Sequence, residues 1–294
     1  MRHGYALLCS LFLGCTTTPA VTESTTTDAT ADAATDATTG SDASVDVSGD
    51  ASASNGQVKL AVTTGVSMLY SQGIARLSNG WAFSAKAGLW RTDNDFNQVV
   101  EKINPLPQNL LDQGFGHIGD IDAADGKLYV GLEQGDFSKG KQAVAWFDPQ
   151  TLDFLGTVDL PQHENPCLAI DETTLIAYTP DKYHGTEIRR YDVKNAWKPL
   201  PSLTLSQQLD AMQGLDVADG ALWFSCDDAV HGLYRADLKT GETVQIGSAG
   251  HLEATGSVMP EVEGIDASHT GSGFLHVLTN EPLQATSWVD DFVL

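Results

Sequence analysis

The stretch that decides the fold runs from residue 117 to residue 133 and reads His117-Ile-Gly-Asp-Ile-Asp-Ala-Ala-Asp-Gly-Lys-Leu-Tyr-Val-Gly-Leu-Glu133. Apolar residues alternate on both sides of Asp125-Gly126, which predicts two strands. The Asp-Gly dipeptide is favoured in tight hairpin turns because both residues adopt positive φ readily. The stretch is therefore expected to form an antiparallel hairpin with Leu128 and Val130 on one face of its second strand.

Weaker copies of this hairpin recur along the chain at intervals of 45–50 residues. Each copy continues into an apolar second strand and then a third strand that ends in Asp. Four short antiparallel strands per repeat of this length are typical of a β-propeller blade. We therefore predict an all-β fold, a single β-propeller over residues 57–294 with five blades, six being the alternative. The five copies begin at Gln72, Gly119, Leu168, Gln213 and Glu263.

The two ends of this domain are expected to complete one blade together. An alternating strand, residues 58–62, precedes the first repeat, whereas little chain follows Asp290 in the last repeat. We predict that the N-terminal strand is the outer strand of the last blade and closes the ring, which removes open sheet edges. Helical periodicity is nearly absent, and one short turn of helix is expected at residues 206–212.

The N-terminal segment reads as an export signal followed by a tether. Arg2 precedes a short apolar run, and Leu13-Gly14-Cys15 resembles the cleavage box of bacterial lipoproteins. Residues 1–14 are thus predicted to be a signal peptide and Cys15 the lipidated N-terminus; an ordinary secretory signal is the alternative. Residues 15–56 are almost entirely Thr, Ala, Ser, Asp and Gly and are predicted to be a disordered tether. The protein is expected to be exported and lipid-anchored to the bacterial cell envelope.

The charge of residues 57–294 restricts the partners. This part of the chain has 32 acids and 15 Lys or Arg, a net charge near −17. Such a surface argues against nucleic acid and anionic membranes as partners, so the membrane is contacted only through the lipid anchor. A small molecule, a glycan or a protein at the propeller rim remains, and a cation is compatible with the charge.

Candidate site residues follow from the propeller repeat. Inner strands begin, and second strands end, on one face of the ring around the central channel. On that face, Gln72, His117, Asn165 and Gln213 are predicted to bind ligand. Carboxylate oxygens are ligands that calcium prefers, so the predicted metal ligands are Asp120, Glu133 and Glu263. No residue is assigned a catalytic role.

Two aspartates of the inner strand are distinguished by the repeat. Asp122 has counterparts in three other copies and is therefore predicted to be structural. Asp120 stands where the other copies have Gly or Ala, which makes it the sharper functional candidate. Cys167 and Cys226 fall on the same face in neighbouring blades, and two alternatives stay open: a disulfide or two buried thiols.

The repeated Gly-Ile/Leu-Asp strands resemble the broad group of exported bacterial propellers with NHL-type and SMP-30-like repeats. Gln72-Gly73-Ile74 and Gln213-Gly214-Leu215 also resemble the propeller-type glutaminyl cyclases. That family carries a catalytic Glu where this chain has residues 81–84, which include no acid, so cyclase activity is not expected. Resemblance to SMP-30-type hydrolases implies a calcium site that Glu263, Asn165 and Asp120 would supply.

Two functional hypotheses follow. The first is a membrane-tethered binding module that presents its rim or channel to a ligand or protein at the cell envelope. The alternative is a calcium-dependent hydrolase or lyase in the channel, with Asp120, Glu133, Glu263 and His117 as metal ligands or acid–base groups.

Overall fold

The computed structural model describes residues 57–134, 141–249, 260–267, 274–281 and 286–293. The predicted signal peptide, Cys15 and the tether lie outside these residues. The helices in the described part of the chain, α1 (Gln108–Leu111) and the 3-10 helix η1 (Val193–Asn195), are both too short to span a membrane.

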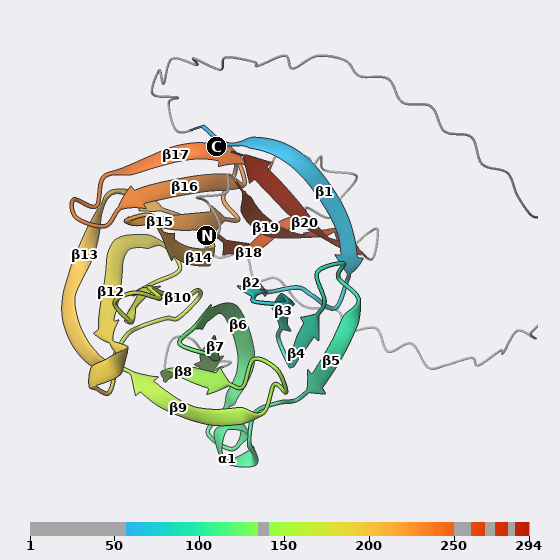
Figure 1. The fold of residues 1–294 in the computed structure, drawn as a ribbon. Helices are drawn as coiled ribbons and strands as arrows, with labels where there is room; N and C mark the ends of the chain where they lie inside the picture. Colours follow the sequence, from blue (N-terminus) through green and yellow to red (C-terminus); the bar gives the residue numbers. More distant parts are fainter. Residues whose placement is uncertain (1–56, 135–140, 250–259, 268–273, 282–285, 294) are drawn as a thin grey trace, which may run out of the picture. The chain divides into compact units, whose positions relative to one another are not determined.

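Five antiparallel sheets of four strands each surround a central axis (Figure 1). Their inner strands contact one another around that axis, each touching the next and β18 touching β2. The first two blades are β2 (Gly73–Leu77), β3 (Gly80–Ala85), β4 (Gly88–Thr92) and β5 (Gln98–Ile103), then β6 (Phe115–Ala124), β7 (Lys127–Gln134), β8 (Gln142–Phe147) and β9 (Phe154–Leu160). The prediction of five blades is confirmed.

The remaining blades follow in chain order until the ring closes. The third is β10 (Ala169–Ile170), β11 (Ile176–Pro180), β12 (Gly185–Asp192) and β13 (Lys198–Leu209). The fourth is β14 (Met212–Ala218), β15 (Ala221–Cys226), β16 (Gly232–Asp237) and β17 (Thr243–Ser248). The fifth is β18 (Glu261–Asp266), β19 (Leu275–Glu281), β20 (Thr286–Val293) and, at its outer edge, β1 (Lys59–Ser67).

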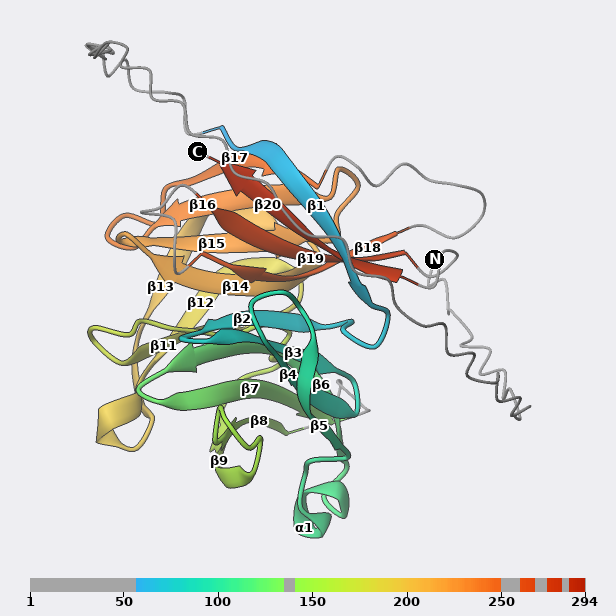
Figure 2. The same cartoon turned by 45° about the vertical axis from the view of Figure 1, so that its right-hand side comes forward.

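The N-terminal strand closes the ring as predicted. β1 pairs antiparallel with β20, and Lys59 lies opposite Val293 in the register (Figure 2). Asp290, buried on β20, accepts a hydrogen bond from Thr63 Oγ1 at 2.8 Å and so links the two strands through side chains. The backbone N–H of Val58 also donates to Ile246 O of β17 at 2.7 Å, which attaches the first described residues to the fourth blade.

Turn chemistry explains why the chain reverses where it does. Asp125 and Gly126 have φ of 49° and 68°, as the Asp-Gly signature predicts. The Asp that follows a third strand accepts hydrogen bonds from backbone N–H groups of the next turn. In the second blade, Asp148 Oδ1 accepts from the N–H groups of Gln150 and Thr151 at 2.8 and 2.9 Å. The Asp residue that follows a third strand therefore stabilises the turn after it.

The core lies between the blades. Buried apolar side chains form five clusters, and each cluster fills the space between one pair of neighbouring blades. Two fully buried phenylalanines illustrate the rule: Phe147 of β8 packs towards the first blade, and Phe224 of β15 packs towards the third. Each sheet is thus buried on both faces, which accounts for the nearly continuous apolar second strands.

Three of the inner strands are bonded to their neighbours by an aspartate of the repeat. Asp122 Oδ2 accepts from the N–H of Ile170 in the next blade at 2.5 Å, and its Oδ1 accepts from Ala123 N–H at 2.6 Å. Asp216 likewise accepts from Ala267 N–H, and Asp266 from Arg76 N–H. Burial raises the pKa of Asp122 to about 8. Burial also raises the pKa of Asp216 well above its ordinary value.

The helix expected at residues 206–212 is wrong. Residues 206–209 belong to β13, and Met212 begins β14. The register between β12 and β13 shifts in this segment, because Thr204 pairs with Glu187 whereas Leu209 pairs with Gly185. The extra residues place buried Leu205 and Leu209 four positions apart, which mimics helical spacing.

The two cysteines occupy the core without bonding. Cys167 and Cys226 are free thiols, both fully buried in the cluster between the third and fourth blades. Burial raises the pKa of both thiols. The alternative of two buried thiols is therefore the one found, and no disulfide joins Cys167 to Cys226. Both side chains pack as small apolar groups in that core.

Candidate functional site

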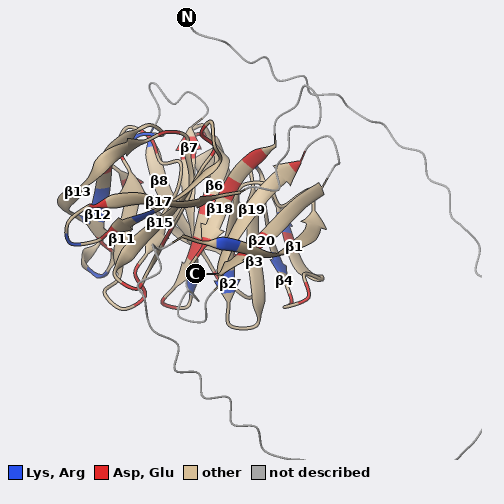
Figure 3. Cartoon of the chain, turned by 90° about the horizontal axis from the view of Figure 1, so that it is seen from above, with Lys and Arg blue, Asp and Glu red and all other residues tan. Residues whose placement is uncertain are grey.

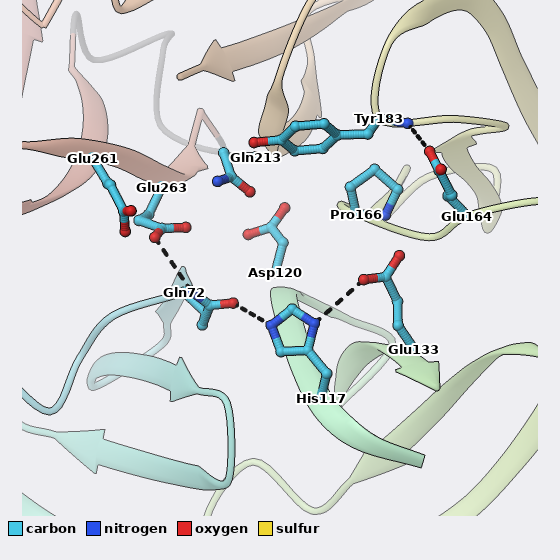
Figure 4. A pocket seen from close by; sticks show the side chains of 10 residues that line it. All are labelled: Gln72, His117, Asp120, Glu133, Glu164, Pro166, Tyr183, Gln213, Glu261 and Glu263. Carbon is cyan, nitrogen blue, oxygen red and sulfur yellow. Dashed lines mark hydrogen bonds and ion pairs between the residues drawn. The ribbon is translucent and has the colours of Figure 1, made fainter. Parts of the chain in front are cut away.

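A cavity of about 350 Å³ lies at the channel end where the inner strands begin. Acidic positions, coloured red in Figure 3, occur on β6 and β18, and these two strands contact each other. Five of its ten lining residues carry carboxyl groups, and none is Lys or Arg. All five blades contribute to the lining, which consists of Gln72, His117, Asp120, Glu133, Glu164, Pro166, Tyr183, Gln213, Glu261 and Glu263 (Figure 4).

Asp120 of β6 lies at the centre of this cavity with only 1% of its surface exposed. Its Oδ2 accepts a hydrogen bond from the backbone N–H of Leu215, across the channel in β14, at 2.9 Å. Its Oδ1 has no hydrogen-bond partner in the described structure. Burial raises the pKa of this carboxyl well above its ordinary value, although the backbone N–H groups of Leu215, Ile121 and Leu168 oppose the shift.

The glycines that replace Asp120 in other blades explain how its side chain fits. A Cβ on Gly264 would lie 2.7 Å from the Cα of Gly73 and 3.0 Å from Asp120 Oδ1. A Cβ on Gly73 would lie 2.7 Å from the backbone N of Ile121. The glycines let the inner strands approach at the axis, and the Asp120 carboxyl occupies the space that remains.

A chain of hydrogen bonds crosses the cavity from β7 to β18. His117 Nε2 lies 2.7 Å from Gln72 Oε1, and His117 Nδ1 lies 3.3 Å from Glu133 Oε2 (Figure 4). Gln72 Nε2 in turn donates to Glu263 Oε1 at 3.2 Å. Because Gln72 Oε1 can only accept, His117 Nε2 is the donor. The imidazole is therefore held in one orientation by neighbours from two blades.

Asn165 lies behind the cavity instead of lining it. It is fully buried, its Nδ2 donates to Ala143 O at 2.8 Å, and its Oδ1 accepts from Thr179 Oγ1 at 2.7 Å. Its backbone N–H donates to Glu133 Oε1 at 2.8 Å. Asn165 therefore positions Glu133. The other six predicted residues (Gln72, His117, Gln213, Asp120, Glu133 and Glu263) all line the cavity.

Four lining residues, Pro166, Glu261, Glu164 and Tyr183, were not among the predicted ligand and metal residues. The last two are hydrogen-bonded to each other. Both belong to the third blade, Glu164 before β10 and Tyr183 between β11 and β12. Glu164 Oε2 accepts a hydrogen bond from the backbone N–H of Tyr183, so the two segments hold each other. A loop that joins the second and third strands opens on the same face as the channel mouth. This general property of the blade is the one feature by which Tyr183 could have been predicted from the sequence.

Charge is concentrated on β18. Glu261 and Glu263 are two positions apart and so point to the same side of the strand. Burial raises the pKa of Glu263 well above its ordinary value, and the Glu261 and Asp227 carboxyls add to the shift. Burial and Asp227 also raise the pKa of Glu261. A bound cation would favour the ionised forms of these groups and lower both pKa values.

The three predicted metal ligands share the cavity without forming a coordination set. Asp120 is bonded to Leu215, Glu133 to Asn165, and Glu263 to Gln72 and Asn280. Across the described ranges, no three His, Cys, Asp or Glu side chains are grouped so that they could hold a metal ion. The donor set is spread around the wall, which suits a ligand larger than a single ion.

Comparison with known proteins gives the fold. No protein-family model and no curated protein matches the sequence. The structure is similar to glutaminyl cyclase from Myxococcus xanthus, with a TM-score of 0.57, 13% identity, and coverage of 80% of this chain and 95% of that one. It is also similar to the PQQ-bound aldose sugar dehydrogenase of Streptomyces coelicolor (TM-score 0.49, 12% identity, 81% of this chain and 98% of that one) and to a luciferin-regenerating enzyme (0.47, 11%, 76% and 77%). At such identities the likeness is one of fold alone, and it agrees with the resemblance to propeller-type cyclases at that level.

Proposed function

We propose that this protein is a binding module that takes a small organic cation, a molecule bearing an ammonium group, into the channel cavity. The observation that carries the proposal is Asp120 Oδ1, a buried carboxyl oxygen that lacks a hydrogen-bond donor. Buried polar atoms in native proteins are nearly always bonded, because an unmet one costs free energy. An ammonium group supplies both the donor and the compensating charge.

The rest of the lining supports the same class of ligand. Four further carboxyls and no Lys or Arg surround Asp120, so the field in the cavity attracts cations. The ring of Tyr183 and the side chain of Pro166 offer apolar surface to the carbon part of the ligand. A bare divalent ion would use oxygen atoms gathered around one point, whereas these carboxyls are distributed around a volume.

The proposal includes a location at the cell envelope. Residues 1–15 carry the features of a lipoprotein signal, and residues 15–56 have the composition of a hydrated tether. A module on such a tether would sample its ligand at the cell envelope. The calcium-dependent alternative uses the same cavity, so one experiment addresses both.

Thermal-shift and calorimetric titrations with primary amines, quaternary ammonium compounds, neutral sugars and CaCl₂ test the proposal. We expect saturable stabilisation by ammonium compounds only. Asp120→Asn keeps the acceptor for Leu215 but removes the charge, and it should weaken amine binding by at least about tenfold. Asp125→Asn, in an exposed turn, is the matched control. No response to any ammonium compound would contradict the proposal, and a response to calcium alone would favour the hydrolase or lyase.

A further inference from the structure

The carboxyl groups of the cavity form two pairs on opposite walls. Glu261 and Glu263 come from the fifth blade, and Glu133 and Glu164 come from the second and third (Figure 4). Asp120 lies between the pairs, near the axis. The two pairs are hereafter called the β18 pair and the Glu133–Glu164 pair.

Each pair has one buried member and one member nearer the solvent. Glu263 is 2% exposed and Glu133 is 6% exposed, and both are fixed by protein donors. Glu261 is exposed and Glu164 half-buried. Glu164 uses one oxygen, Oε2, for the backbone N–H of Tyr183. The outer members therefore stand at the cavity mouth as acceptors, backed by buried carboxyls.

The wall between the pairs is of a different chemical kind. The Tyr183 ring and Pro166 lie on one side of the space above Asp120 (Figure 4). Their carbon atoms form an apolar surface between the two carboxylate pairs. A volume of about 350 Å³ is at the small end of ligand sites, large enough for a flexible chain of a few methylene groups.

The cavity also continues outward past the β18 pair. An adjoining cavity of about 210 Å³ shares Gln72 and Glu261 with it and reaches Met68 and Asn280. Met68 is 54% exposed, so this extension is open to solvent on the rim side. A ligand longer than the main cavity has a way out along this side.

We propose that the ligand is a linear diamine or polyamine, with one ammonium group between Asp120 and the β18 pair, the other at the Glu133–Glu164 pair, and its aliphatic spacer against Tyr183 and Pro166. This inference rests on the proposed function and narrows it. Two charged ends on one chain bind two separated sites with a high effective concentration, so the second contact adds affinity that a monoamine cannot obtain. A longer polyamine extends past Glu261 towards Met68.

Isothermal titration of the full mature chain with 1-aminobutane, 1,4-diaminobutane and a linear triamine tests the inference, at physiological ionic strength so that diffuse attraction to an acidic protein is screened. We expect a stoichiometry of one and a diamine affinity at least about tenfold above that of the monoamine. Glu164→Gln retains an acceptor for Tyr183 N–H and should remove most of the diamine advantage, because it should lower diamine affinity much more than monoamine affinity. Glu172→Gln, an exposed acid outside the cavity, is the control.

The outcomes separate the two proposals. Equal affinities for the monoamine and the diamine, or equal losses for both in Glu164→Gln, would overturn the diamine inference and leave the cation module standing. A stoichiometry well above one that Glu164→Gln does not change would also overturn it, since that result indicates general attraction to the acidic surface. No binding of any amine would overturn both.

Discussion

At the scale of single residues, two aspartates of one strand show how neighbouring positions take different roles. Asp120 and Asp122 are two positions apart on β6, and both are buried at the channel axis. Asp122 uses both carboxyl oxygens for backbone N–H groups, whereas Asp120 uses one. Backbone N–H groups of the fold itself therefore satisfy the Asp122 carboxyl. The Oδ1 atom of Asp120 makes no hydrogen bond in the described structure, and the proposed function assigns its donor to the ligand.

Burial of these acids predicts the pH dependence of ligand binding. The pKa values of Asp120 and Glu263 are raised, so both carboxyls retain protons at a higher pH than ordinary acids do. A bound ammonium favours the ionised forms, so binding should release protons and affinity should fall as the pH is lowered. Titration at one pH in two buffers of different ionisation enthalpy counts the released protons.

Two variants check the origin of that proton release. Glu263→Gln and Asp120→Asn should each reduce the number of protons released, whereas Asp125→Asn should not. An affinity that does not change with pH, without proton exchange on binding, would rule out this account.

At the scale of strands and loops, the repeat made most of the structure predictable but not all of the site. Period-two alternation and Asp-Gly turns identify strands and their faces, so six of the seven predicted residues reach the cavity. Asn165 is adjacent to the cavity, yet its direction is set by bonds to Ala143 and Thr179 that no pattern reveals. Glu164 and Tyr183 lie in loops, where side-chain direction has no period.

In the third blade, the aspartate aligned with Asp122 has a different role from its counterparts in the repeat. Asp171 aligns with Asp122 in sequence, but the chain turns there, and its carboxylate accepts from the N–H groups of Thr173 and Thr174 at 2.9 and 2.8 Å. Its inner strand β10 has only two residues. The same type of residue thus joins blades in three repeats and caps a turn in this one.

The inter-blade bonds give a stability prediction. Asp122→Ala leaves the N–H of buried Ile170 without its acceptor, and it should lower the free energy of unfolding by about 1–3 kcal/mol. For a domain of this size that corresponds to a fall in Tm of about 2–12 °C, at roughly 2–4 °C per kcal/mol. Chemical denaturation measures the change, with Asp95→Ala, at an exposed position, as the control. Equal stability of the two variants would show that the bond to Ile170 contributes nothing.

At the scale of the whole molecule, closure of the ring depends on a strand taken from the other end of the chain. β1 covers the edge of β20, and partly buried Leu60 and Val66 pack on the clusters on either side of the fifth blade. The sequence made this arrangement predictable, because an unpaired strand at the start complements an incomplete repeat at the end. Without β1, the β20 edge would be open to other chains.

Circular permutation separates the strand from its position in the chain. Lys59 lies opposite Val293, so residues 57–67 can follow Val293 through a short added linker in a chain that begins at Met68. We expect this permutant to melt within a few degrees of the parent. The matched chain that begins at Met68 and lacks the strand should lose at least about 10 °C in Tm or aggregate. Similar melting of both chains would contradict closure by β1.

The attachment of the first described residues to β17 has a mechanical consequence. Tension from the N-terminal side enters the domain at Gln57 and Val58, whose bonds to Gln245 O and Ile246 O measure 3.0 and 2.7 Å. When these two bonds break, the pull passes to Lys59 and then along the rungs between β1 and β20. β1, which closes the ring, is therefore also the first strand loaded by tension. A stretched molecule would lose β1 from the fifth blade and open its ring while the other four blades are still intact.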